Sequence, residues 1–150
     1  MAAQFPAGCG DSGPYMQTIL LVDNDPLQAS FRKSLLERRF RNVLRVGDAA
    51  EALCLVEQAA FALSLGLVIC QPNIPGIGGP EFVAELHERL PYVPVLVLGG
   101  WAEEANRNFH SGYVRYLPWP YKNDGLLDVV EEMLTQDFPL EHLFHNQRAS

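Results

Sequence analysis

Three short segments of this chain are apolar almost without interruption, and they restrict its fold more than any other feature. They are residues 18–22 (TILLV), 67–70 (LVIC) and 95–98 (VLVL). A strand with one face in water alternates apolar and polar residues, whereas a strand that is apolar throughout is covered on both faces. Because each segment is followed by a stretch with helical periodicity, we predict the central strands of a parallel sheet between two layers of helices.

Two further segments complete the predicted sheet. Residues 43–46 and 114–117 have strand character, but each contains an arginine, Arg45 and Arg115. A charged side chain is easier to accommodate on an edge strand than on a strand covered on both faces. The spatial order 2-1-3-4-5 places these two strands at the edges. The prediction is therefore an α/β protein with a flavodoxin-like, three-layer α/β/α architecture, (βα)5, and a parallel five-stranded sheet in that order.

The first predicted helix begins shortly after residues 18–22. Asp25 is a typical N-cap residue, and proline, here Pro26, is favoured at the first helical position. We expect this helix to extend to about residue 39. Its apolar residues at four-residue spacing, which predict the face that packs on the sheet, are Leu27, Phe31 and Leu35.

Capping signals and periodicity predict four more helices. Asp48 and Glu51 form a capping-box pattern that opens the second helix. Further helices are expected at about residues 80–90 and 123–136, with a weaker one at 101–110. The residues expected to form apolar faces are Ala49, Ala52, Leu53 and Val56 in the second helix, Phe82, Leu86 and Leu90 in the helix at 80–90, and Leu127, Val130 and Leu134 in the last.

The bulk composition is that of a soluble globular protein. We predict one domain at residues 17–136, a mobile tail at 1–16, which is rich in Gly, Ala, Pro and Ser, and a second tail at 137–150. No apolar run is long enough to span a membrane, and the first residues lack the features of a secretory signal, so a cytoplasmic location and no membrane partner are expected. The net charge of −7 argues against direct binding of nucleic acid.

Three segments in a fixed order resemble the receiver domain of two-component response regulators. They are residues 19–26 (ILLVDNDP), 73–79 (NIPGIGG) and 116–121 (YLPWPY). The resemblance extends from about residue 17 to 136. It implies a phosphorelay module in which a histidine kinase phosphorylates an aspartate after the third strand. In such receivers two acidic residues after the first strand hold Mg²⁺, and a Ser or Thr after the fourth strand and a Lys before a later Pro bind the phosphoryl oxygens.

The positions that carry this chemistry in receivers are mostly replaced here. The first acidic position matches Asp23, but the second matches Asn24, and the phosphoacceptor position matches Gln71. The hydroxyl position falls on Gly99 and the lysine position on Trp119. A glutamine amide is not a usable nucleophile, and one carboxylate is a poor Mg²⁺ site. The resemblance therefore implies a degenerate pseudo-receiver without the phosphoacceptor aspartate, with no enzymatic activity and no cofactor, and with doubtful Mg²⁺ binding.

A pseudo-receiver would act through protein contacts. By resemblance, the docking surface is formed by the fourth helix, fifth strand and fifth helix, and its candidate anchors are Trp101, Tyr113, Tyr116 and Tyr121. Tyr116 could equally be a half-buried aromatic residue of an edge strand. The partner would be a histidine kinase, a downstream effector or a second copy of the chain.

Three alternatives to the pseudo-receiver remain open at the level of the sequence. The first is a small-molecule-binding domain that uses the crevice at the strand ends, with Trp119 as a stacking wall. The second is an enzyme built on the same fold, since fold alone does not give function. The third is an unusual receiver that is phosphorylated elsewhere, for example on Asp23 or Asp25.

Overall fold

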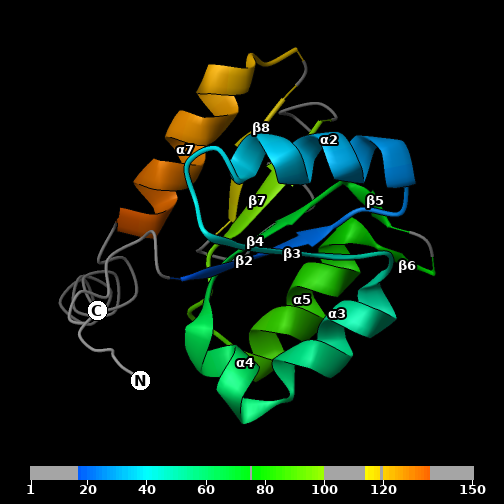
Figure 1. Cartoon of the computed structure of the whole chain (residues 1–150). Coiled ribbons are helices and arrows are strands. Elements are labelled where there is room, and N and C mark those ends of the chain that lie inside the picture. Colours follow the sequence, from blue (N-terminus) through cyan, green and yellow to red (C-terminus); the bar gives the residue numbers. More distant parts are fainter. Residues whose placement is uncertain (1–16, 75, 100–113, 119, 136–150) are drawn as a thin grey trace, which may run out of the picture.

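The computed structural model describes residues 17–74, 76–99, 114–118 and 120–135. Its centre is a sheet of five parallel strands in the order β3-β2-β4-β7-β8 (Figure 1). Numbered along the chain, this is the predicted order 2-1-3-4-5, and the two strands that contain arginine lie at the edges. The strands are β2 (Thr18–Val22), β3 (Asn42–Val46), β4 (Leu65–Cys70), β7 (Val95–Leu98) and β8 (Val114–Leu117).

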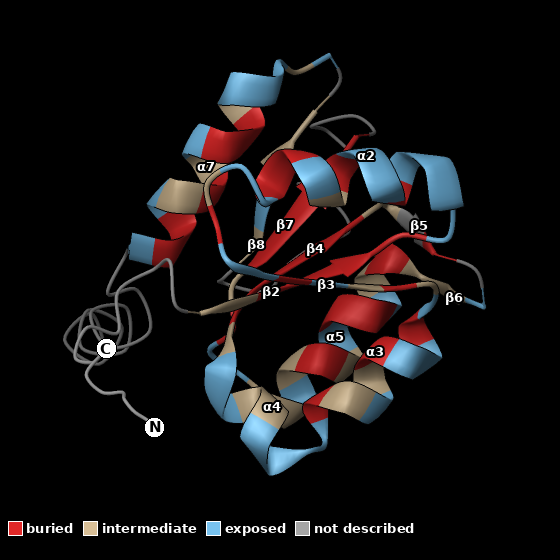
Figure 2. Cartoon of the chain, viewed as in Figure 1, coloured by how far each residue is buried: buried red, intermediate tan, exposed pale blue. Residues whose placement is uncertain are grey.

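Helices cover both faces of the sheet, as predicted (Figure 1). Helices α2 (Pro26–Leu36) and α7 (Asn123–Thr135) lie on one face. Helices α3 (Ala49–Val56), α4 (Ala59–Ser64) and α5 (Gly79–Arg89) lie on the other. The sheet separates two clusters of buried apolar side chains, one under each helical layer (Figure 2). The strands that are apolar throughout are buried almost completely, because both of their faces pack on helices.

Local signals predicted most helix starts correctly. The Asp25 carboxylate accepts hydrogen bonds from the backbone amides of Leu27 and Gln28, at 3.0 and 3.3 Å. The Asp48 carboxylate accepts one from the Glu51 amide at 2.8 Å. The predicted inward residues of α3, α5 and α7 are buried or half-buried.

The sequence did not predict two small elements. Helix α4 has only six residues, and nearly all of them are apolar, so its sequence has no polar face that would mark a helical period. The Pro/Gly turn after β4 contains a short antiparallel pair, β5 (Asn73–Ile74) and β6 (Ile77–Gly78). Gly76 in this turn has a φ of 88°, a left-handed conformation that glycine adopts readily because it has no Cβ.

Helix α2 differs from its prediction in two ways. It ends at Leu36 rather than near residue 39, because the amides of Arg38 and Arg39 form tight-turn hydrogen bonds to the carbonyls three residues before them. The predicted apolar face was also wrong for two of its three residues, since Leu27 is 83% exposed and Phe31 is 58% exposed, whereas Leu35 is buried as predicted. The helix instead buries Ala29, Arg32, Leu35 and Leu36.

The predicted helix at 101–110 and the predicted tails lie outside the described residues. Within the described part of the chain, no helix has the length and apolar character needed to cross a membrane.

Candidate functional site

The candidate site lies at the carboxyl edge of the sheet, which is the side where the carboxyl ends of its parallel strands lie. Asp23 follows β2 directly, Gln71 follows β4, and Gly99 follows β7. Because the strands are parallel and adjacent, these residues come to one edge, where open α/β sheets usually bind ligands. The backbone of Asp23 is fixed on both sides. Its amide donates to the Val46 carbonyl at 3.0 Å, and its carbonyl accepts from Arg45 Nε at 3.0 Å.

The Asp23 side chain forms a buried ion pair with Arg32. Arg32 Nη1 lies 2.9 Å from Asp23 Oδ2, and the two side chains are 6% and 0% exposed. The other carboxylate oxygen, Oδ1, accepts a hydrogen bond from the Asp25 amide at 3.0 Å. Charged side chains are rarely buried unless they are paired. The pairing therefore explains why an arginine is on the inner face of α2.

A hydrogen-bonded network extends from Arg32 to the phosphoacceptor position. Gln28 Oε1 accepts from Arg32 Nη1 at 3.1 Å and from Gln71 Nε2 at 3.1 Å. Arg32 Nη2 also donates to the Tyr121 hydroxyl at 3.1 Å. One guanidinium thus connects the end of β2, helix α2 and the segment that follows β8. Through Gln28, it also reaches Gln71 at the end of β4.

The sequence reasoning found only part of this network. Asp23 and Gln71 were predicted as site residues, whereas Gln28 and Arg32 were missed. A signal for Arg32 was present, because Ala29, Arg32 and Leu36 follow the same three- and four-residue spacing as an inward stripe. Tyr121 was predicted as a partner anchor, and it is half-buried against the core with its hydroxyl turned to Arg32.

Gly99 has a backbone conformation that fits glycine and disfavours a residue with a hydroxyl side chain. Its φ is 87°, a region that L-residues with a Cβ rarely adopt. Its amide donates to the Leu117 carbonyl at 2.9 Å, which fixes this conformation to the end of β8. A Ser or Thr at this position would therefore be strained unless the backbone changed.

The remaining predicted site residues are exposed or half-buried, or lie outside the described residues. Asn24 is exposed, next to the buried Asp23. Tyr116 is half-buried and packs against the core cluster under α3 and α5, in line with the reading of an edge-strand aromatic residue. Trp101, Tyr113 and Trp119 lie outside the described residues.

Cys70 is the only thiol next to the candidate site among the described residues, and it is not a competent nucleophile. It is the last residue of β4 and is completely buried. Burial raises the pKa of its thiol to about 12, because the thiolate would have to form without solvent. A thiol with this pKa is protonated at neutral pH.

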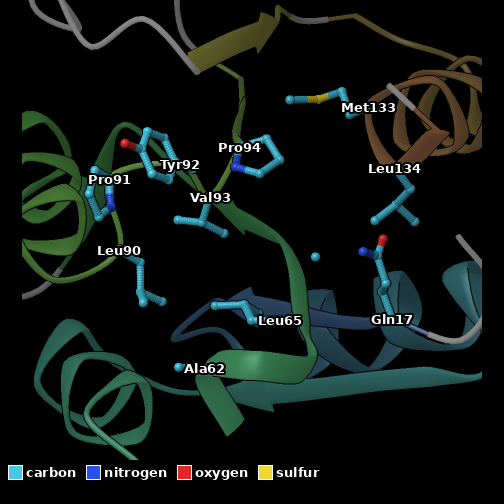
Figure 3. Close-up of a pocket in the computed structure, with 11 residues that line it drawn as sticks. Gln17, Ala62, Leu65, Leu90, Pro91, Tyr92, Val93, Pro94, Met133 and Leu134 are labelled. Carbon is cyan, nitrogen blue, oxygen red and sulfur yellow. The ribbon is translucent and has the colours of Figure 1, made fainter. Parts of the chain in front are cut away.

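A hollow of about 300 Å³ lies at the opposite edge of the sheet (Figure 3). It is formed by the start of β4, the segment before β7 and the last turn of α7, and includes Leu65, Tyr92 and Met133. Leu65 begins β4 and Gln71 follows its end, so the hollow is roughly 20 Å from the candidate site. It does not include Gln71, Gly99 or Asp23, and so gives no support to a small-molecule site at the carboxyl edge.

Comparison with known proteins points to one family. The family model for the response regulator receiver domain matches residues 19–131. The hydrogenase transcriptional regulatory protein HoxA of Cupriavidus necator is 29% identical over 119 residues, which cover 77% of this chain and 23% of that protein. The transcriptional regulatory protein CpxR of Escherichia coli is 28% identical over 137 residues, covering 90% of this chain and 56% of that protein. The chain therefore spans about a quarter of the first relative and little more than half of the second.

Solved structures give the same result for the fold. A response regulator receiver protein from Sinorhizobium medicae superposes with a TM-score of 0.69 at 22% identity, covering 79% of this chain and 94% of that one. The receiver domain of the hybrid histidine kinase CckA gives 0.65 at 28% identity, covering 78% and 98%. With a family match over most of its length and the parallel sheet of a receiver, the chain belongs to the response regulator receiver domain family.

Proposed function

We propose that this chain is a pseudo-receiver, a phosphorelay-family module that is not phosphorylated at the family's acceptor position and that acts by binding other proteins. Receiver domains are signalling modules rather than enzymes. The observation that carries the proposal is the residue at the end of β4. Gln71 has an amide where an acyl phosphate would need a carboxylate, and this amide donates to Gln28.

The surroundings of Gln71 support the same proposal. A receiver stabilises the transferring phosphoryl group with positive charge and hydrogen-bond donors. Here Arg32 is paired with Asp23, the Arg45 side chain donates to the Asp23 carbonyl, and the position after β7 has no side chain. Asp23 as a substitute acceptor is disfavoured because its side chain is buried and both of its oxygens accept hydrogen bonds.

The phosphorylation part of the proposal is tested with a small-molecule phosphodonor. The full chain is incubated with acetyl phosphate and MgCl₂ beside a receiver that has an acceptor aspartate, and both are analysed by intact mass. We expect a phosphoryl adduct on the control receiver only. A stoichiometric, hydroxylamine-labile adduct on this chain would overturn the proposal, and peptide mapping would then locate it, with Asp23 and Asp25 as the first candidates.

The partner is proposed to be a histidine kinase, a downstream effector or a second copy of the chain. The exposed side chains of Leu27 and Phe31 support a contact surface on α2, because they form an apolar pair one helical turn apart. The face around Tyr116 that was predicted by resemblance stays part of the proposal. The same proposal takes residues 17–136 as the receiver unit, 1–16 and 137–150 as its tails, and the cytoplasm as its location.

A further inference from the structure

The candidate site can be tested for its fit to the Mg²⁺ that the family implies. Mg²⁺ prefers octahedral coordination by oxygen, keeps several of its waters, and is usually held by one or two carboxylates and phosphate oxygens. By the family's pattern, the ligands in this chain would come from Asp23 and Asn24 at the end of β2. The fit therefore depends on how accessible and how strongly charged the Asp23 carboxylate is.

The Asp23 carboxylate is not accessible to a hydrated metal ion. Its side chain is 0% exposed. Oδ1 accepts from the Asp25 amide at 3.0 Å, and Oδ2 accepts from Arg32 Nη1 at 2.9 Å. A metal ion that keeps its waters has no path to this carboxylate unless the Arg32 side chain moves away.

The local charge also opposes a divalent cation. Asn24 and Gln71 are neutral, and the guanidinium of Arg32 balances the charge of Asp23. Asp25 is exposed, and its carboxylate is used to cap α2. The described residues also contain no group of three His, Cys, Asp or Glu side chains that could hold a metal ion. The residues therefore do not fit Mg²⁺ as long as Arg32 is in place.

We propose that the Arg32 guanidinium is a tethered internal cation that occupies the metal position of this receiver. It binds the carboxylate of Asp23 directly and holds Gln28 and Tyr121 in the same network. Arginine suits this role because its planar fork can donate to several acceptors at once and it stays protonated. The conformation of the carboxyl edge is then independent of Mg²⁺. This inference rests on the proposed function but concerns the metal and not phosphoryl transfer.

The test restores the missing carboxylate with and without the internal cation. Asn24 is exposed, so Asn24→Asp should fold and supplies a second carboxylate. Mn²⁺ binding to the full chain is measured by electron paramagnetic resonance, and Mg²⁺ competes for the site. We expect no stoichiometric Mn²⁺ binding by the parent or by Asn24→Asp. The double variant Asn24→Asp/Arg32→Met should bind Mn²⁺ more than about tenfold more tightly, because the metal-competent state no longer has to displace the guanidinium.

A matched control is given by Arg39, which forms its ion pairs on the surface with Asp128 and Glu131. The variant Asn24→Asp/Arg39→Met changes the net charge by the same amount and should bind Mn²⁺ no better than Asn24→Asp. Equal Mn²⁺ binding by Asn24→Asp and the Arg32 double variant would overturn the proposal, as would a folded double variant that binds no metal. If the double variant does not fold, Mn²⁺ binding is measured on Asn24→Asp alone. Tight Mn²⁺ binding by that variant would show that Arg32 does not block the metal position, and would overturn the proposal.

The failure of this inference can be distinguished from the failure of the proposed function. Metal binding by the parent chain without a phosphoryl adduct would overturn the proposal that Arg32 is an internal cation, but it would not contradict the proposed pseudo-receiver function. A phosphoryl adduct that forms equally with and without Mg²⁺ would overturn the pseudo-receiver and leave the internal cation intact.

Discussion

Helices α2 and α7 lie side by side on one face of the sheet, yet they distribute polarity in opposite ways. Helix α7 buries five apolar residues and exposes acidic ones, as an amphipathic helix does. Helix α2 buries an arginine and leaves Leu27 and Phe31 in solvent. The two helices are similar in length, with 11 and 13 residues. Apolar periodicity alone therefore does not decide which face of a helix packs inward.

The difference is explained by what lies under each helix. Under α7 the buried side chains of the sheet are apolar, so burial of leucine and valine determines its orientation. Under α2 lies the Asp23 carboxylate, which is buried and needs a positively charged donor. The ion pair with Arg32 fixes the rotation of α2, and the positions of Leu27 and Phe31 follow from it.

The largest expected effect comes from breaking this ion pair. Arg32→Met keeps much of the side-chain volume but leaves the Asp23 carboxylate buried without its counter-ion. We expect a loss of about 3–5 kcal/mol in the free energy of unfolding, measured by urea denaturation. Arg39→Met, which removes a half-buried arginine that pairs with two carboxylates at the surface, should cost about 1 kcal/mol or less. A loss for Arg32→Met as small as that of the control would contradict the assigned role of the pair.

The second prediction removes both charges. In Asp23→Asn/Arg32→Met no buried charge is left unpaired, so most of the stability lost in Arg32→Met should return. Replacing a buried ion pair by neutral groups is often close to neutral in stability. The coupling energy from a double-mutant cycle should be about 3 kcal/mol or more, because it includes most of the stability lost in Arg32→Met. Additive losses would mean that the two side chains stabilise the protein independently.

The third prediction concerns α7, whose buried residues are all apolar. Leu127 is 4% exposed, and Leu127→Ala should cost about 2–5 kcal/mol because it leaves a cavity against the sheet. Its control is Glu132→Gln on the outer side of the same helix, which weakens a surface pair with Arg115 at 2.8 Å and should cost less than about 1 kcal/mol. Urea denaturation measures both losses, and each variant is expected to unfold in a single transition.

The same comparison shows how far the sequence could predict this molecule. The uninterrupted apolar strands and the arginines of the edge strands were sufficient for the sheet order, and capping and periodicity for Asp25 and the inward face of α7, because burial and local hydrogen bonds determine these features. Apolar periodicity failed for the first half of α2, since the spacing of Leu27 and Phe31 does not show that the buried Asp23 carboxylate at the end of β2 pairs with Arg32. Gln71 could be recognised from the residues that follow it, but its contact with Gln28 depends on the rotation of α2 and could not.

The smallest expected effect is the most direct test of that rotation. Phe31 is 58% exposed and borders a hollow of about 340 Å³ that includes Ser34, Arg38 and Asn123 at the start of α7. Phe31→Ala should therefore change the free energy of unfolding by less than about 1 kcal/mol, whereas Leu36→Ala, at a fully buried position of the same helix, should cost about 2–5 kcal/mol. Urea denaturation of the two variants measures the difference. Equal losses would mean that Phe31 is packed as tightly as Leu36, which would contradict the rotation of α2 that turns Arg32 toward Asp23 and leaves Phe31 in solvent.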